Sequence, residues 1–360
     1  TETSNNVVDL IFSLPNVSDL LRKLSLIYND NPIKIERNGT GRNNLLFISL
    51  MLSFIEDPER AQSTFFRIVG LEEPEAHLHA NLQNHLASNL EGLIKKEDGT
   101  YRKDIQLILT SHSNHITTKI DFDNNVVLHY KNSNVQAHYI LDGFGTTAEE
   151  KRQVNYLKKY LDSENVNLFY SRRLALVEGI SEKLLFPLFY KIQTGETIDQ
   201  SATAVVNVNG LAFKNFLQII VNGFHTKCLV LTDSDIGTQS ENRAQELKNK
   251  YDSVNEIDVQ ISQLSTFEKD LINCNKSGSG KTILCKVIPI VRPNAGKKYV
   301  EELGTNDIDI EEYFALIEDY KSEFALQLSL SLTEDQSGFS IPKYIAVSYT
   351  HLRAHETVLD

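Results

Sequence analysis

Acidic side chains follow two short apolar runs of the sequence, Leu174–Val177 and Cys228–Leu231. Short apolar runs that stop at polar residues are typical of strands buried on both faces of a parallel sheet. The carboxyl ends of such strands meet at one sheet edge, where α/β proteins place their ligands. Crowded carboxylates repel one another unless a hard divalent cation lies between them. The acids expected to share this cation site are Glu178, Glu182, Asp233 and Asp235.

The segments around these acids should bring them together. Gly179 allows a sharp turn after the first strand, and Ser181 can cap the helix that follows, with Glu182 in its first turn. Asp233 and Asp235 are two residues apart at a strand end, so their side chains should point the same way. The strand and helix expected between the two runs cover residues 204–206 and 211–221.

This arrangement resembles the TOPRIM domain, whose signature is a glutamate and glycine after one strand and Asp-x-Asp after another. Here the matching residues are Glu178-Gly179 and Asp233-Ser234-Asp235. The resemblance implies a Rossmann-like parallel sheet, Mg²⁺ or Mn²⁺ as cofactor, and a reaction that cuts, joins or polymerises nucleic acid.

Two later segments resemble one TOPRIM group, the OLD family (overcoming lysogenization defect). Leu264–Leu271 is similar to its Thr-Leu-Glu-x-Asp-Leu segment, which implies that Glu268 is a ligand of a second metal. Tyr320–Ala325 is similar to its Lys-Gly-x-Phe-Ala segment, which implies that Lys321 is catalytic, although serine replaces the glycine. Without the resemblance, Glu268 would be an acid in a first helical turn and Lys321 a solvated lysine.

The N-terminal part of the chain resembles the C-terminal half of an ABC-type ATPase domain. A glycine-containing loop with Gly39 and Gly41 precedes an apolar helix at 45–55, and such a helix start favours phosphate. The expected strand 65–71 ends in Glu72 and Glu73, which resemble Walker B acids. His112 follows the strand expected at 105–109 and matches the switch histidine. The resemblance assigns all five of these residues to ATP; an ordinary loop and a structural histidine are the alternatives.

The sequence predicts an α/β chain of several parts. We expect a partial ATPase domain over 1–147, a helical linker over 148–170 and a TOPRIM domain over 171–346. Within the first part, 126–129 should be a strand and 131–147 a loop. Residues 347–360 resemble translated sequencing-adapter sequence, show no helical or strand period, and are expected to stand outside the fold. A helix is expected over Val17–Ile27.

The chain is expected to be a fragment, because its only methionine is Met51 and the Walker A segment of the resemblance is absent. Lys276–Thr282 resembles the end of such a P-loop but has Asn275 where the template requires glycine. We therefore expect a mobile basic loop here. The net charge of −12 does not favour a general nucleic-acid binder, and no apolar run is long enough to span a bilayer.

Together these features predict a metal-dependent DNA endonuclease that an ATPase domain regulates. In this hypothesis Glu178, Lys321 and Glu73 are catalytic, and two metal ions assist phosphodiester hydrolysis. The resemblance implies DNA as substrate, a homodimer or higher homo-oligomer, no membrane, a cytoplasmic location and a role in phage defence or DNA repair. The alternatives are a topoisomerase-like or primase-like reaction, or a non-catalytic DNA-binding ATPase scaffold.

Overall fold

The computed structural model describes residues 18, 27–28, 31–34, 39–56, 66–96, 98–131, 134–161, 165–210, 212–224 and 226–353. These residues form two compact units, Thr1–Ile116 and Thr117–Asp360. No described helix is both long and apolar enough to cross a lipid bilayer. The helix expected over Val17–Ile27 lies mostly outside the described residues, and Ile27 begins a strand instead.

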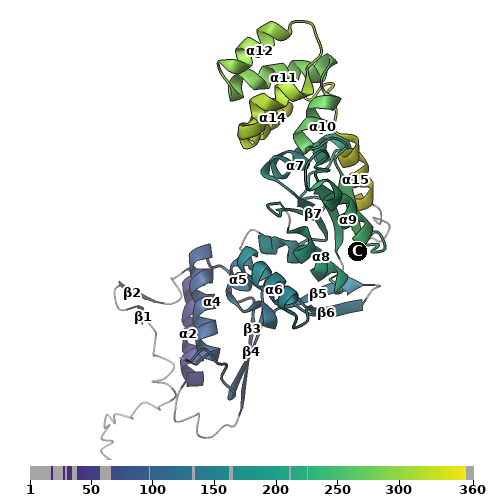
Figure 1. Cartoon of the computed structure of the whole chain (residues 1–360). Helices are drawn as coiled ribbons and strands as arrows, with labels where there is room; N and C mark the ends of the chain where they lie inside the picture. Colours follow the sequence, from purple (N-terminus) through teal and green to yellow (C-terminus); the bar gives the residue numbers. More distant parts are fainter. Residues whose placement is uncertain are drawn as a thin grey trace, which may run out of the picture. The chain divides into compact units, whose positions relative to one another are not determined.

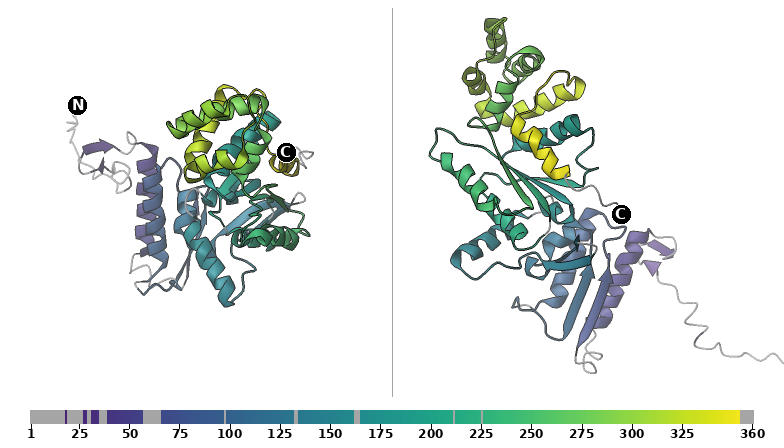
Figure 2. Two further views of the ribbon diagram at one scale, coloured as in Figure 1. Left: turned by 45° about the horizontal axis from the view of Figure 1, so that its top comes forward. Right: turned by 90° about the vertical axis from the view of Figure 1, so that its right-hand side faces the viewer.

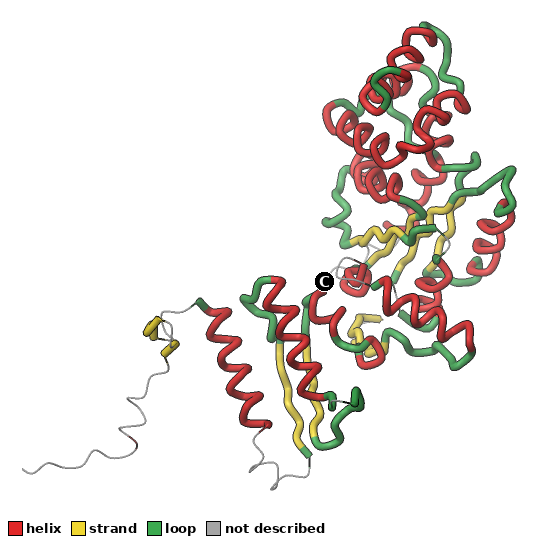
Figure 3. The backbone as a smooth tube through the Cα atoms, turned by 60° about the vertical axis from the view of Figure 1, so that its left-hand side comes forward, coloured by secondary structure: helices red, strands yellow, loops and turns green. Residues whose placement is uncertain are grey.

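The N-terminal unit contains two long parallel strands, β3 (Arg67–Glu72) and β4 (Ile105–Thr110), which lie side by side in Figure 3. Their register pairs Glu72 with Thr110, so both strands end at the same edge. The helix α4 (Ala80–Ile94) packs on β4 through its buried leucines. The other elements are β1 (Ile27–Tyr28), β2 (Asn31–Lys34), α2 (Thr40–Glu56) and α5 (Asn114–Lys119), which spans the division between the units.

The C-terminal unit is built on a parallel sheet with the strand order β10-β9-β7-β8. This sheet confirms the predicted α/β fold. The central strands β7 (Arg173–Val177) and β9 (Lys227–Thr232) are the two predicted apolar runs, and they are almost wholly buried. The outer strands are β8 (Thr203–Asn207) and β10 (Ile257–Ile261).

Side chains alternate along the central strands and build two separate cores. Ala175 and Val177 belong to one core, whereas Leu174 and Leu176 belong to the other. Helices on both faces complete these cores, as Figure 1 shows. The first core includes helices α7 (Ile180–Thr194), α10 (Phe267–Cys274), α11 (Gly278–Val291), α13 (Ile310–Ile317), α14 (Lys321–Glu334) and α15 (Lys343–Arg353). The second includes α6 (Ala148–Tyr160), η3 (Asn165–Tyr170), α8 (Phe213–Val221) and α9 (Glu241–Tyr251).

The remaining helices of this unit are short. α12 (Ala295–Leu303) packs on α11, and η4 (Glu318–Tyr320) leads into α14. η2 (Phe122–Asn124) precedes β5. Figure 2 shows the helices from α11 to α14 as a group at one end of the unit, where α14 packs on both α7 and α11. In contrast, α15 packs on β9 and β10.

The segment between the two expected domains differs from its prediction. β5 (Val126–Lys131) pairs with β6 (Asn134–Tyr139) in an antiparallel hairpin, so part of the predicted loop 131–147 is a strand. This hairpin and α6 lie within the C-terminal unit, because Leu157 and Leu161 pack into its second core. β6 is mostly exposed, which is why its sequence carries no clear apolar signal.

Two further expectations need correction. The tail expected outside the fold contributes α15 up to Arg353, and its Tyr349 and Leu352 are buried in the first core; residues 354–360 lie outside the described part. The expected mobile loop at 276–282 is largely the first turn of α11. Its Lys281 donates to the carbonyls of Gly304 and Asn306.

Candidate functional site

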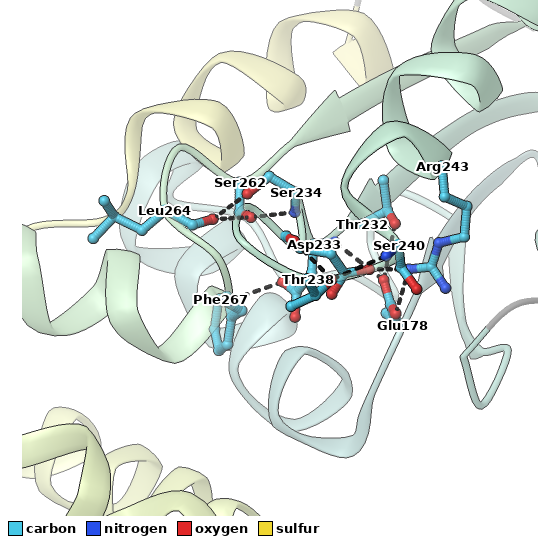
Figure 4. A network of polar contacts seen from close by, with 11 residues as sticks. Glu178, Thr232, Asp233, Ser234, Thr238, Ser240, Arg243, Ser262, Leu264 and Phe267 are labelled. Atoms are coloured by element: carbon cyan, nitrogen blue, oxygen red, sulfur yellow. Dashed lines mark hydrogen bonds and ion pairs between the residues drawn. The ribbon is translucent and has the colours of Figure 1, made fainter. Parts of the chain in front are cut away.

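Glu178 lies directly after β7, and Figure 4 shows its side chain beside Thr232, Asp233 and Arg243. One carboxylate oxygen accepts from the Thr232 hydroxyl at 2.8 Å and from the Asp233 backbone N–H at 3.0 Å. The other accepts from Arg243 at 2.9 Å. The Glu178 carbonyl accepts from the Gly210 N–H at 3.1 Å. The ends of β7, β8 and β9 are therefore tied together around this acid.

The two aspartates after β9 have different partners. Asp233 accepts from the Phe267 N–H at 2.8 Å, at the first turn of α10. Asp235 has a left-handed backbone (φ 51°) and contacts Arg243 at 3.0 Å. The strand ends at Thr232, so the alternation used to predict a common direction does not reach these residues. Ser234, between them, bonds to the loop after β10.

Glu182 is buried in the first turn of α7, close to other acids. Burial raises the pKa of Glu182 to about 8, and the charges of Glu268 and Glu178 add to this effect. Gly179 is extended rather than turned; its lack of a side chain leaves room for Glu182, whose carboxylate oxygen would lie 3.0 Å from an added Cβ. The predicted Ser181 cap is wrong, since Gly179 occupies the N-cap position.

Glu268 forms the other side of the acid cluster. It is 3% exposed, accepts from the Ser181 hydroxyl at 2.9 Å and pairs with Lys321 at 3.0 Å. Burial opposes the charge on Lys321, but its pKa is raised because Glu268, Asp233 and Glu182 stabilise the ammonium. Burial likewise raises the pKa of Asp233, followed by the charges of Glu182, Glu178 and Glu268.

Two polar residues at the start of α10 stabilise the helix and the loop before it, and do not contact the acid cluster directly. Asp270 accepts from the backbone N–H groups of Gln263 and Leu264 at 2.6 and 3.0 Å. Thr266 caps α10 by accepting from the Lys269 N–H. These bonds stabilise the first turn of α10, which carries Glu268. Asp270 and Thr266 therefore position Glu268 without contacting it.

The chemistry of this acid cluster fits a hard divalent cation. Its donors are carboxylate oxygens, which Mg²⁺ and Mn²⁺ prefer. Burial first, and then the charges of neighbouring acids, raise the pKa of Glu182 and of Asp233, and a cation would stabilise their charged forms. Within the described residues, however, no three His, Cys, Asp or Glu side chains converge tightly enough to hold a metal as they stand. The acids have other partners instead: Arg243 contacts Glu178 and Asp235, Lys321 contacts Glu268, and the start of α10 donates to Asp233.

Sequence reasoning missed the contacts of three residues at or near the cluster. Arg243 lies in a polar segment whose composition indicated only solvent exposure, yet it bridges Glu178 and Asp235. Ser181 was expected to cap a helix. Tyr344 of α15 is buried, and burial, followed by the charges of Asp233 and Glu182, raises its pKa well above the ordinary value.

The N-terminal unit brings its own predicted residues together at the ends of β3 and β4. Glu75 accepts from the Ser111 hydroxyl at 2.8 Å and from the His112 N–H at 2.7 Å. The His112 ring lies 3.5 Å from Glu73. Glu72 is the last residue of β3 and is exposed. The acids and the histidine therefore share one edge.

The predicted glycine-containing loop is instead largely the start of α2, which packs against the turn after β3. Gly41 lies so close to the His77 carbonyl that an added Cβ would be 2.4 Å from its oxygen, whereas Gly39 has open space around it. Asn44 donates to the carbonyls of Pro74 and Ala76. Glycine is thus required at position 41 by a close backbone approach.

Comparisons with known proteins agree with this division. A family model for an AAA ATPase domain matches residues 2–117, and a model for the overcoming lysogenization defect protein-like TOPRIM domain matches residues 169–235. The chain is 25% identical over 279 residues to endonuclease GajA of Bacillus cereus (strain HuB5-5). That alignment covers 72% of this chain and 39% of GajA, so the chain spans less than half of that relative.

Solved structures of OLD proteins also match. The C-terminal region of the Burkholderia pseudomallei OLD protein is 22% identical, with a TM-score of 0.38 over 51% of this chain and 97% of that chain. The corresponding region from Xanthomonas campestris pv. campestris is 20% identical, with a TM-score of 0.37 over 52% and 94%. The two family models and the relative support an OLD-family protein in which an AAA ATPase domain is followed by an OLD-like TOPRIM domain.

Proposed function

We propose that the acid cluster hydrolyses phosphodiester bonds of DNA and that the ATPase domain regulates this endonuclease activity. The observation that carries the proposal is that acids from three separate segments lie together: Glu178 and Glu182, Asp233, and Glu268. Lys321, from a fourth segment, pairs with Glu268. Burying so much negative charge is costly unless cations accompany it. The name of the relative GajA, an endonuclease, supports the same reaction.

Divalent cations would be held by the carboxylates of the cluster. We assign one ion to Glu178, Glu182, Asp233 and Asp235, and a second to Glu268, with Asp233 shared between them. Two such ions would activate the attacking water and stabilise the leaving oxygen. Arg243 would have to release Glu178 and Asp235 when the first ion binds, because it contacts both carboxylates.

Lys321 has the charge and the position to act on a bound phosphate. Its ammonium group is about one-third exposed and stays protonated, since Glu268 raises its pKa. A fixed cation beside the scissile phosphate stabilises the negative charge that develops in the transition state. Ser181 holds Glu268 from the opposite side and so keeps the pair in place.

Hydrolysis fits the site better than strand transfer by a topoisomerase. That reaction needs a tyrosine that reaches the phosphate and ionises. Tyr344 is the tyrosine whose pKa the acids affect. It is 7% exposed, and burial and the charges of the carboxylates raise its pKa. Both effects disfavour a nucleophilic phenolate, so a water-derived nucleophile is the better match.

ATP is proposed to bind at the edge formed by Glu72, Glu73 and His112, with the glycine loop at Gly39–Gly41 beside it. Glu73 would polarise a water and His112 would contact the terminal phosphate, as the family resemblance implies. ATP takes no part in phosphodiester cleavage in this scheme and acts as a conformational signal. A homodimer or higher homo-oligomer and a cytoplasmic role in phage defence or DNA repair complete the proposal.

Plasmid cleavage with Mg²⁺ or Mn²⁺, with and without ATP, tests the function directly. Wild-type protein should convert supercoiled plasmid to nicked or linear DNA. Asp233→Asn should lose this activity, whereas Glu301→Gln, an exposed acid on α12, should retain it. Relaxed and religated plasmid would instead indicate a topoisomerase. DNA binding without cleavage would indicate a scaffold, and unchanged cleavage by Asp233→Asn would refute the assignment of the site.

A further inference from the structure

An open groove of about 470 Å³ lies between α6 and α8 in the C-terminal unit, outside the acid cluster. The two helices pack against each other. The groove is lined by Glu149, Arg152, Gln153, Tyr156, Lys214 and Asn215. None of these residues has a role in the cluster chemistry, so the groove needs its own explanation.

The groove is locally basic in a chain whose net charge is −12. Arg152 is exposed and donates to the Ala148 carbonyl, and among the described residues it has no carboxylate partner. Lys214 pairs with Glu149 at 3.4 Å, with both side chains more than half exposed. Such an exposed pair is weak, so Lys214 can exchange Glu149 for a phosphate at little cost. Two cations are therefore available to an anionic ligand.

An aromatic ring lines the groove together with these cations. Tyr156 lines the groove and stacks on Tyr160, with ring centroids 5.4 Å apart and planes 12° apart. Tyr160 is held in turn by an edge contact with Phe216 and by donation to the Asn207 carbonyl. A preorganised ring beside two cations is the combination that proteins use for the bases and phosphates of single-stranded nucleic acid.

A short loop links the aromatic pair at the groove to the strand end that carries Glu178. Asn207 ends β8 and bonds to Tyr160. Three residues later, Gly210 donates to the Glu178 carbonyl at 3.1 Å, while Val208 donates to that of Val177 at 2.9 Å. The loop 207–210 therefore touches the aromatic wall of the groove at one end and the strand end that carries Glu178 at the other.

We propose that the α6–α8 groove binds the DNA strand next to the cleaved bond. Arg152 and Lys214 contact its phosphates, and an unpaired base stacks at Tyr156. This inference rests on the proposed nuclease function, for which it names the part of the substrate held away from the reacting phosphate. It also explains how an acidic chain holds a polyanion, since the basic contacts are local.

Fluorescence anisotropy with a labelled single-stranded DNA in EDTA measures binding without cleavage. Reversing two charges in Arg152→Glu/Lys214→Glu should weaken binding by about tenfold or more and lower the slope of log Kd against log salt by about 1.4. Lys297→Glu/Lys298→Glu makes the same charge change at exposed positions of α12 and should alter Kd by less than about twofold. Arg152→Gln/Lys214→Gln, which removes charge without adding acids, replaces the first variant if that one fails to fold.

Tyr156 gives an independent arm. Tyr156→Ala should weaken binding by about fivefold or more, and Tyr156→Phe should bind like wild type, because the ring and not the hydroxyl makes the contact. Equal losses in the α6–α8 and α12 charge variants, or no DNA binding by the wild type, would overturn the groove assignment. Plasmid cleavage by Asp233→Asn tests the nuclease separately, so either idea can fail while the other stands.

Discussion

The two strand-end sites of this chain hold similar side chains in opposite environments. In the N-terminal unit, Glu73 and His112 are 54% and 81% exposed and lie 3.5 Å apart. In the C-terminal unit, Glu182 and Glu268 are 5% and 3% exposed. The charge of Glu268 adds to the effect of burial in raising the pKa of Glu182. At the first site, water can replace the contacts between the side chains at little cost in free energy. At the second site, buried carboxylates repel one another, and a bound cation or proton would reduce this repulsion.

The two environments suit the two sites to different kinds of chemistry. Exposed acids beside a backbone-fixed turn suit a ligand that comes and goes. Buried acids beside a lysine suit a reaction in which charge develops at a defined point. A variant at one site can therefore be compared with a variant at the other site or at a matched position.

The largest effect is expected at Lys321. Lys321→Met should lower the plasmid cleavage rate by about 10²–10³-fold, because it removes the cation beside the scissile phosphate. Lys321→Arg keeps the positive charge, so its cleavage rate should fall less than that of Lys321→Met. The measurement is single-turnover cleavage at saturating DNA and Mn²⁺. A methionine variant as fast as wild type would remove Lys321 from the reaction.

Glu182 should make stability depend on pH. Its pKa is raised to about 8 in the folded chain, above the unfolded value, so the protonated form stabilises the fold. In EDTA this stability should be fully present below about pH 4.3 and lost as the pH rises through about 8. Glu182→Gln should flatten that profile and gain on the order of a few kcal/mol above pH 8.

Glu72→Gln is the matched change at the exposed site and should leave the profile unchanged within about 0.5 kcal/mol. Chemical denaturation at several pH values measures both variants. Mn²⁺ should stabilise wild type at pH 8 by binding the folded state. An identical pH profile for wild type and Glu182→Gln would contradict the burial of charge at this position.

Gly41→Ala should destabilise the N-terminal unit by about 1–3 kcal/mol, because the new Cβ would lie 2.4 Å from the His77 carbonyl oxygen. Gly39→Ala is the control, since nothing lies within 4 Å of its added Cβ. Hydrogen exchange in the 72–79 turn reports the difference locally. Equal exchange in the two variants would show that the close approach does not constrain the loop.

The smallest effect is expected at Arg243. Arg243→Ala removes a cation that competes for Glu178 and Asp235, so calorimetry should show tighter Mn²⁺ binding. The gain is about 1 kcal/mol, or roughly fivefold in Kd. Arg243→Lys keeps the charge but cannot bridge two carboxylates in the same way, and should fall between the two. Weaker metal binding by the alanine variant would mean that Arg243 orients the ligands instead.

The sequence by itself predicted the elements that carry strong local signals. The runs at 174–177 and 228–231 are apolar on both sides because helices cover both faces of the sheet, so β7 and β9 were predictable from composition alone. The acids after them were predictable as neighbours, since parallel strands end at one edge. The family resemblance added Glu268 and Lys321, which no local pattern distinguishes from surface residues.

Tertiary structure alone decided the features that depend on distant partners. Ser181 bonds to Glu268 instead of capping its helix, and Arg243 reaches two acids from a polar helix. β6 and α15 form where the sequence showed no period, because pairing with β5 and packing against the first core stabilise them. Local sequence fixes which face of a strand or helix is apolar, but the partner of a polar side chain depends on the three-dimensional arrangement of segments far apart in the chain.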